Sequence, residues 1–265
     1  MASNYIAGAA ADEITLRRNR ERFEGILLKP RVLVDVSRID TRLELLRQKM
    51  DFPILLAPAA YQRLFHREGE CAAARGAGAA GATFVVSSLA TCAIEEIGRA
   101  AAGPLWFQLY VQRDREFTRD LIQRAESADC RAICVTVDTP VIGMRNREMR
   151  DGFRPPANVE FANLRALGSK TTKAGHIFQG GIYSIVMDPT LTWKGVEWIR
   201  SVSKVPVLLK GILTQEDARL AVEHGAAGIV VSNHGGRNLD TTPATIEALW
   251  FKKILRLTCF SANWG

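Results

Sequence analysis

Helix-like segments alternate with short apolar segments along most of this chain, and that alternation most constrains its fold. Six runs rich in Val, Ile, Leu and Ala have the length and composition of buried strands. They are residues 53–60, 83–87, 105–110, 132–137, 207–210 and 228–231. Helix-like segments between them cover residues 68–80, 94–102, 116–128, 193–202 and 216–224. Alternating strands and helices form a parallel sheet with helices outside it. We therefore predict an α/β fold, and the polar residues that end each strand favour a (β/α)8 TIM-type barrel.

The length and composition fit one globular domain over residues 1–265. Hydrophobic residues make up 47% of the chain and charged residues 24%, which is ordinary for a soluble protein. The net charge of +7 would suit nucleic acid or an anionic membrane, but the basic residues are scattered among acidic ones. No apolar run is long enough to span a bilayer. We predict no nucleic-acid partner and no membrane partner.

The five cysteines do not show the paired spacing of a zinc site. Their odd number and scatter are typical of reduced thiols in a cytoplasmic protein. The N-terminus lacks a basic stretch followed by an apolar one, which a secretory signal needs. We therefore predict no bound metal and a cytoplasmic location.

Residues 76–81, Gly-Ala-Gly-Ala-Ala-Gly, match the glycine pattern of dinucleotide-binding proteins. That fingerprint requires a strand before the glycines and a helix after them. Here a helix precedes them and a strand follows, so we predict a helix end with close packing and no nucleotide site.

Residues 232–240, Ser-Asn-His-Gly-Gly-Arg-Asn-Leu-Asp, directly follow the last of the six predicted strands. His234 can move a proton near neutral pH, and Arg237 offers a planar guanidinium that suits a carboxylate. Gly235 and Gly236 allow a sharp turn between them. In a barrel of this type, the carboxyl ends of the strands form the catalytic face.

Other chemically active side chains also stand at strand ends: Gln108, Tyr110, Thr136, Asp138 and Lys210. Stability alone explains such a set poorly, because buried polar groups need mutual partners or a ligand. The sequence therefore predicts an active site at the carboxyl ends of the strands.

The 232–240 string resembles the signature of the FMN-dependent 2-hydroxy-acid oxidases and dehydrogenases, a family that includes glycolate oxidase, lactate oxidase, flavocytochrome b2 and mandelate dehydrogenase. The resemblance implies oxidation of a small (S)-2-hydroxy acid, with FMN as cofactor. His234 would take the hydroxyl proton, Asp138 would stabilise the protonated imidazole, and Tyr110 would bind near the reacting oxygen. Tyr5, Arg145 and Arg237 would hold the substrate carboxylate.

The same resemblance implies the residues that contact FMN. Lys210 would lie beside flavin N1 and act in catalysis by offsetting the charge of the reduced ring. The other implied cofactor contacts are Ala57, Pro58, Ala59, Ser87, Gln108, Thr136 and Ser232. Leu89 stands where glycolate oxidase has a bulky Trp, which favours L-lactate or a similar short-to-medium 2-hydroxy acid. Members of the family often assemble as homo-oligomers, so we expect one here.

Two regions depart from the regular pattern. Residues 145–188 form a long polar segment with Pro155-Pro156 and Gly180-Gly181, which fits either a lid over the active site or a disordered insert. Residues 250–265 do not resemble the family, whose last two strands and phosphate-binding loops are not recognisable here. We therefore expect an incomplete barrel in a member truncated at its C-terminus. Apolar residues at helical spacing between Ile246 and Leu257 would extend a helix that covers one edge or contacts a partner or a membrane surface, and we favour the covering helix.

Three functions remain open on the sequence alone. The retained site residues favour an FMN-dependent 2-hydroxy-acid oxidase or dehydrogenase. The missing phosphate loops favour a truncated, non-catalytic member that does not bind FMN. A third alternative is another FMN barrel enzyme, such as the type 2 isopentenyl-diphosphate isomerase, but Tyr5, His234 and Arg237 suit a hydroxy acid better.

Overall fold

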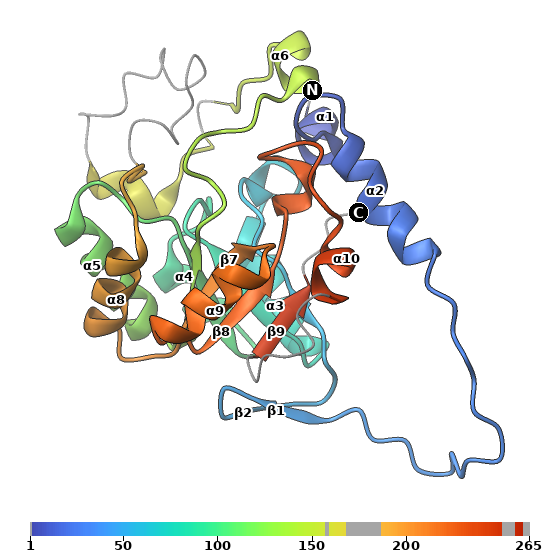
Figure 1. Ribbon diagram of the computed structural model, residues 1–265. Coiled ribbons are helices and arrows are strands. Elements are labelled where there is room, and N and C mark those ends of the chain that lie inside the picture. Colours follow the sequence, from blue (N-terminus) through green and yellow to red (C-terminus); the bar gives the residue numbers. More distant parts are fainter. Residues whose placement is uncertain (1, 157–158, 168–186, 251–257, 262–265) are drawn as a thin grey trace.

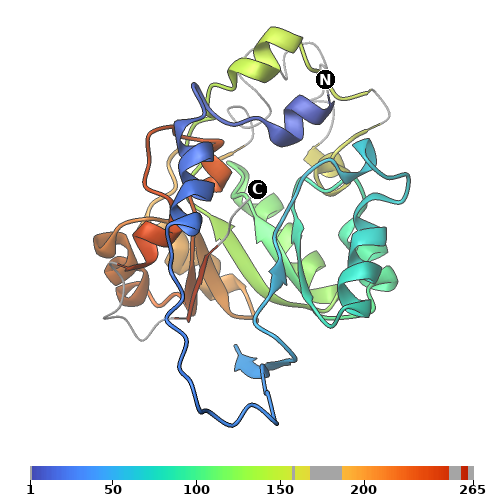
Figure 2. The same ribbon diagram turned by 90° about the vertical axis from the view of Figure 1, so that its right-hand side faces the viewer.

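A parallel sheet of seven strands curls into an incomplete barrel (Figures 1 and 2). The computed structural model of the protein describes residues 2–156, 159–167, 187–250 and 258–261. The strands are paired in chain order: β3 Leu55–Leu56, β4 Thr83–Ser87, β5 Leu105–Leu109, β6 Cys130–Thr136, β7 Val207–Ile212, β8 Gly228–Val231 and β9 Thr258–Ser261. All the pairs are parallel, so all the strands end at the same face of the barrel.

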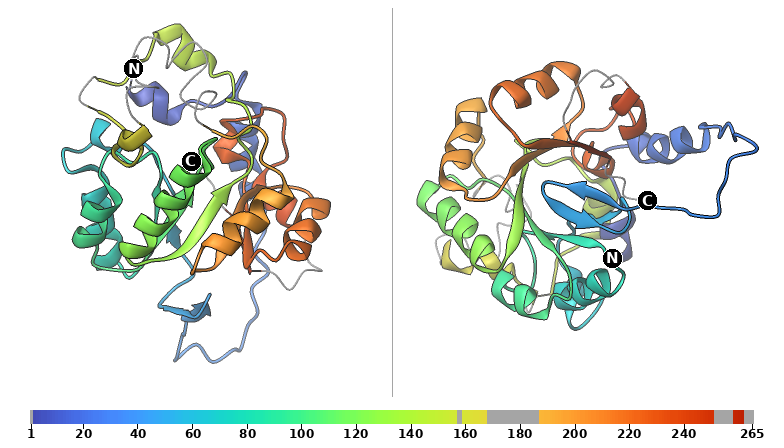
Figure 3. Two further views of the ribbon diagram at one scale, coloured as in Figure 1. Left: turned by 90° about the vertical axis from the view of Figure 1, so that its left-hand side faces the viewer. Right: turned by 90° about the horizontal axis from the view of Figure 1, so that it is seen from below.

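Helices cover the outside of the sheet (Figure 3, left). They are α3 Gly69–Ala79, α4 Ile94–Ala100, α5 Arg115–Ser127, α8 Trp193–Val202, α9 Gln215–Glu223 and α10 Thr245–Trp250. Side-chain caps explain where two of them begin, because Asp114 accepts hydrogen bonds from the first turn of α5 and Thr214 accepts one at the start of α9. None of the described helices is long and apolar enough to cross a membrane.

Two apolar layers hold the barrel together. The larger lies between the strands and the outer helices, and it includes Phe84, Phe107 and Ile133. The smaller fills the barrel interior around Trp106 and Leu208. A hairpin of β1 Leu43–Leu45 and β2 Gln48–Met50 packs on this inner layer and closes the end of the barrel opposite the strand carboxyl ends (Figure 3, right).

The structure confirms the incomplete α/β barrel and its six predicted strands, and it adds a seventh. Residues 258–261 pair with β8 as β9, so one of the two strands expected to be unrecognisable is present. The expected helix between Ile246 and Leu257 is confirmed only through α10, which ends at Trp250; residues 251–257 lie outside the described part. The 76–81 glycines end α3 before β4, as predicted, and a Cβ on Gly78 would lie 2.4 Å from backbone atoms of residues 102 and 103.

The segment predicted as a lid has more regular structure than expected. It contains α6 Asn146–Asp151 and the 3-10 helix η2 Ala162–Leu167, whereas residues 168–186 lie outside the described part. The sequence did not predict α6, because this helix is polar and contains no buried residue. α6 lies beside α1 Ala2–Ala7, above the strand carboxyl ends (Figure 1).

An exposed segment connects α2 Ile14–Glu24 to the β1–β2 hairpin and runs away from the barrel (Figure 1). Its residues 30–36 form no described strand. Several apolar side chains along it are exposed, and those of Leu28, Val32 and Leu33 are at least 80% exposed.

Candidate active site

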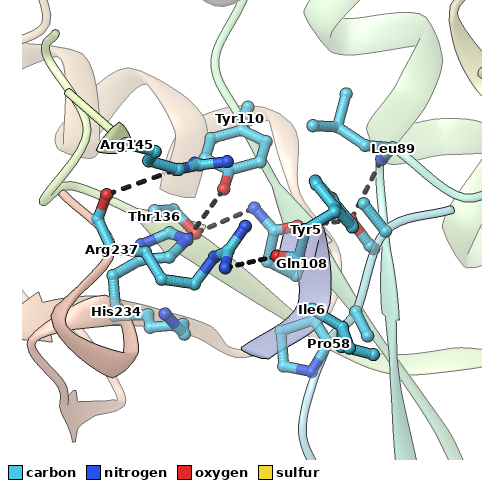
Figure 4. A pocket seen from close by; sticks show the side chains of 14 residues that line it. Tyr5, Ile6, Pro58, Leu89, Gln108, Tyr110, Thr136, Arg145, His234 and Arg237 are labelled. Atoms are coloured by element: carbon cyan, nitrogen blue, oxygen red, sulfur yellow. Dashed lines mark hydrogen bonds between the residues drawn. The ribbon is translucent and has the colours of Figure 1, made fainter. Parts of the chain in front are cut away.

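A pocket opens at the carboxyl ends of the strands and brings together residues from most of the chain (Figure 4). Its lining consists of Tyr5, Ile6, Pro58, Ala59, Ala60, Ser87, Leu89, Gln108, Tyr110, Thr136, Arg145, Lys210, His234 and Arg237. Most of the predicted site residues are in this set. Its polar groups come from strands β4 to β8 and from the segments α1 and α6 above them.

The turn after β8 gives His234 its position. His234, Gly235 and Gly236 all have positive φ angles, of 58°, 65° and 71°. For His234 this conformation is strained by about 1–2 kcal/mol. Asn233 supports the turn by accepting a hydrogen bond from the amide of Gly236. A Cβ at Gly236 would lie 2.9 Å from the amide nitrogen of Leu16, so the close approach of α2 also requires glycine there.

Asp138 orients the imidazole of His234. Its Oδ1 lies 2.8 Å from Nδ1 of His234, and both side chains are less than 20% exposed. An ionised carboxylate only accepts hydrogen bonds, so Nδ1 carries the proton and Nε2 is the unprotonated, basic nitrogen. Nε2 lies 3.2 Å from the hydroxyl of Tyr110. The basic nitrogen of His234 therefore faces the pocket.

The surroundings keep this pair in one charge state near neutral pH. Burial and the charge of Lys210 lower the pKa of His234, and they outweigh the opposing effect of Asp138. Burial alone would raise the pKa of Asp138, but the neighbouring His234 and Lys210 lower it to about 2. Because the imidazole is buried beside a cation, we assign a neutral His234 next to an ionised Asp138.

Two guanidinium groups line the pocket together with His234 (Figure 4). Arg237 donates from Nη1 to the backbone oxygens of Tyr5, at 2.7 Å, and of Gly8, and its guanidinium lies 5.1 Å from the ring centre of Tyr5. Arg145, at the start of α6, donates from Nε to the backbone oxygen of Arg237 at 3.4 Å. Both arginines also form ion pairs with Glu148, at 3.2 Å.

A row of polar side chains crosses the floor of the pocket. Ser87 donates to Gln108 at 3.1 Å, and Gln108 donates to Thr136 at 2.8 Å, across strands β4, β5 and β6. Lys210, on β7, is paired in register with Thr136 on β6. Its Nζ donates a hydrogen bond to Ser232 Oγ at 3.3 Å. Lys210 is 2% exposed and forms no ion pair with any described carboxylate. The floor thus combines hydrogen-bonding groups with a buried positive charge.

Three predicted residues do not line the pocket. Ala57 precedes the lining residue Pro58 in the chain. Ser232 contacts the pocket residue Lys210, and Asp138 contacts the pocket residue His234. The sequence interpretation missed Ile6, Ala60 and Glu148. Only Glu148 carried a signal, since an acid three residues after Arg145 can pair with it on a helix.

A group of possible metal ligands lies outside the pocket. Ligand atoms of Cys71, Cys92 and Glu96 lie within 4.8 Å of one another, although these residues do not show the paired spacing of a metal motif along the chain. Burial and the neighbouring Cys92 raise the pKa of Cys71 to about 12. The thiol of Cys71 is therefore protonated at neutral pH.

The chain is similar to known proteins over nearly its whole length. The family model for FMN-dependent dehydrogenases matches residues 1–255. Glycolate oxidase 1 of Zea mays is 46% identical over 252 residues, which cover 94% of this chain and 68% of that protein. Glycolate oxidase of Spinacia oleracea is 45% identical, with the same coverage.

Solved structures are also similar to this chain. The crystal structure of a mandelate oxidase with (S)-4-hydroxymandelic acid superposes with a TM-score of 0.91 and 39% identity, covering 98% of this chain and 74% of the other. At this identity, and with the family model matching nearly the whole chain, the chain belongs to the FMN-dependent dehydrogenase family.

Proposed function

We propose that this protein oxidises a small (S)-2-hydroxy acid to the 2-oxo acid, with FMN as the cofactor that its family requires. The observation that carries the proposal is the oriented base: Asp138 holds His234 so that its unprotonated Nε2 faces a pocket that two arginines also line. A base and a carboxylate-binding cation in one pocket match a substrate with a hydroxyl next to a carboxylate.

The floor of the pocket fits FMN. The row from Ser87 through Gln108 to Thr136 offers donors and acceptors for the polar edge of the ring, and Lys210 offers a buried cation with only Ser232 as its hydrogen-bond partner among the described residues. The small residues Pro58 and Ala59, next to Ala57, allow a flat ring to approach the end of β3 closely. When bound, FMN supplies the acceptor for the two electrons that leave the substrate.

His234 and the residues around it have separate roles in proton transfer and substrate binding. Nε2 of His234 takes the hydroxyl proton of the substrate, and the negative charge of Asp138 stabilises the imidazolium that results. Tyr110 directs its hydroxyl at the same position, 3.2 Å from Nε2, where it can hydrogen-bond the reacting oxygen. Arg237 and Arg145 bind the carboxylate, and Tyr5 packs beside Arg237.

Leu89 supports a preference among 2-hydroxy acids. It lines the pocket, is 1% exposed, and is smaller than the Trp that the family resemblance implies at this position in glycolate oxidase. The space left by a leucine accommodates a methyl group or a longer side chain. We therefore propose L-lactate, or another short-to-medium 2-hydroxy acid, as the substrate.

The visible absorption spectrum of the purified chain with added FMN tests this function. We expect a flavin band that stays with the protein and that bleaches when L-lactate is added without oxygen. A chain that retains no flavin would instead be a non-catalytic member of the family. Flavin that is retained but not reduced by L-lactate, glycolate or mandelate would exclude the proposed substrates.

Two further expectations concern the state of the protein in the cell. The exposed apolar side chains of residues 26–39 favour association, so we propose a homo-oligomer, which light scattering after size-exclusion chromatography would detect. The four described cysteines are all unpaired, which suits a reducing compartment such as the cytoplasm.

A further inference from the structure

Glu148 touches both arginines of the pocket. It lies on α6, and its carboxylate accepts from Nη1 of Arg145 at 3.2 Å and from Nη2 of Arg237 at 3.2 Å. The three side chains are only 11–15% exposed, so water screens their charges poorly. In a polar surface helix without buried residues, Glu148 is therefore a mostly shielded group at the centre of a charge cluster.

The two arginines need such a group. Arg145 donates to the backbone of Arg237, and both line one small pocket, so two like charges stand next to each other. Their repulsion would drive at least one guanidinium toward solvent. The carboxylate between them offsets one charge and fixes both groups by hydrogen bonds. Among these three side chains one net positive charge remains, which matches a single substrate carboxylate.

We propose that Glu148 is the counter-ion of this arginine pair and adapts the pocket to acids with one carboxylate. The inference rests on the proposed function, in which these arginines bind the substrate. A second carboxylate on the substrate would lie close to Glu148, because the first is held by the same guanidinium groups. Glu148 would repel it, and no further uncompensated arginine charge in this pair would attract it.

The test is Glu148→Gln, which keeps the shape of the side chain and removes its charge. We measure kcat/KM of the FMN-loaded protein for L-lactate and for L-malate, which adds a second carboxylate. The malate-to-lactate ratio should rise about tenfold, the effect of removing one like-charge contact at partial screening. General loosening of the pocket affects both acids and cancels in this ratio. An unchanged ratio overturns the proposal.

Two variants control the result. Glu13→Gln removes the ion pair between Glu13 and Arg147, which ties the same helix to the N-terminal segment but touches neither pocket arginine. Its ratio should equal that of the wild type. Glu148→Asp keeps the charge and should also keep the wild-type ratio, and a shift as large as that of the Gln variant would overturn the electrostatic role.

A binding measurement separates this inference from the proposed function. Propionate and succinate lack the hydroxyl and cannot be oxidised in this way, so calorimetry follows their binding without turnover. Glu148→Gln should raise the affinity for succinate relative to propionate. If the wild type oxidises no hydroxy acid, the proposed function fails while this ratio still decides the role of Glu148. The role of Glu148 is overturned if the succinate-to-propionate affinity ratio is the same in the wild type and the variant, or if neither acid binds.

Discussion

Asp138 and His234 meet at 2.8 Å although they follow strands β6 and β8, which are separated in the sheet by β7. The intervening strand contributes Lys210, whose charge lowers the pKa of both partners. The base, its orienting carboxylate and the cation therefore depend on three successive strands ending at the same level. Parallel pairing guarantees that arrangement.

Replacing His234 with Gln should remove turnover and leave the flavin bound. The amide cannot accept the hydroxyl proton, and a positioned general base contributes about 10²–10⁴-fold to the rate. Stopped-flow reduction of the flavin by L-lactate measures the loss, and the absorption spectrum shows whether the cofactor stays. Rapid reduction in this variant would mean that another group takes the proton.

The activity should fall at low pH because His234 must be neutral to act. The pKa of His234 is lowered in the folded protein, so it becomes protonated only below its ordinary value of 6.5. As pH falls through the lowered pKa, kcat/KM should decrease. A pH profile of kcat/KM between pH 4 and 9 shows the acid limb, and an acid limb above 6.5 would contradict the assignment.

Replacing Asp138 with Asn should slow the reaction and move this acid limb further down. Asp138 raises the pKa of His234 through its charge and hydrogen bond, so its removal lowers that pKa further. The amide can also donate a hydrogen bond to Nδ1, which favours the tautomer with its proton on Nε2, and that nitrogen then cannot act as the base. We expect a loss of about 10²–10⁴-fold in kcat. An acid limb that moves to higher pH in this variant would show that Asp138 does not stabilise the imidazolium.

Much of this site was predictable because its reactive side chains lie at the carboxyl ends of strands. The buried runs around Val85, Val135 and Ile229 are unambiguous strands, and parallel strands necessarily bring the residues that follow them to one face. The positions of Lys210 and His234 at two such ends therefore sufficed to predict that they lie together. β9 was missed because the sequence Thr-Cys-Phe-Ser has no strong strand signal, and only its pairing with β8 reveals it.

Contacts between distant segments could not be predicted in the same way. Asp240 accepts hydrogen bonds from the amides of Asp12, Ile14 and Thr15, which fixes the start of α2 against the turn that bears His234. Nothing in the local sequence of either segment indicates that partner. Glu148 was missed for a related reason, because a charged residue in a polar helix usually faces solvent.

Replacing Gly211 with Ala should damage the site without altering any reacting group. Gly211 has a φ of 112°, and a Cβ there would lie 2.4 Å from the Cβ of Asp138. Asp138 must then move away from His234, so turnover should fall as in the Asn variant, with a loss of about 1–3 kcal/mol in stability. Gly76→Ala is the control, since its Cβ would meet nothing within 4 Å and should stabilise α3 by about 0.5–1 kcal/mol. Thermal unfolding and lactate kinetics on both variants provide the comparison. Full activity in the Gly211 variant would mean that the position of Asp138 is not critical.

Replacing Arg237 with Met should raise KM for the hydroxy acid more than it lowers kcat. Its guanidinium faces the pocket beside Arg145, and each charge-assisted hydrogen bond to a carboxylate is worth about 1.5–3 kcal/mol. The loss of one such bond corresponds to about a tenfold to hundredfold change in KM.

Arg147→Met is the matched control, because Arg147 lies on the same helix as Glu148 but pairs with Glu13 instead of lining the pocket. Arg237 also holds the backbone of Tyr5 and Gly8, so its removal could loosen the N-terminal segment. Loosening would lower the unfolding temperature and kcat together, whereas loss of a carboxylate contact acts mainly on KM. Steady-state kinetics with lactate, combined with thermal unfolding of both variants, distinguishes the two effects. An unchanged KM in the Arg237 variant would place the substrate carboxylate elsewhere in the pocket, beside Arg145 or Lys210.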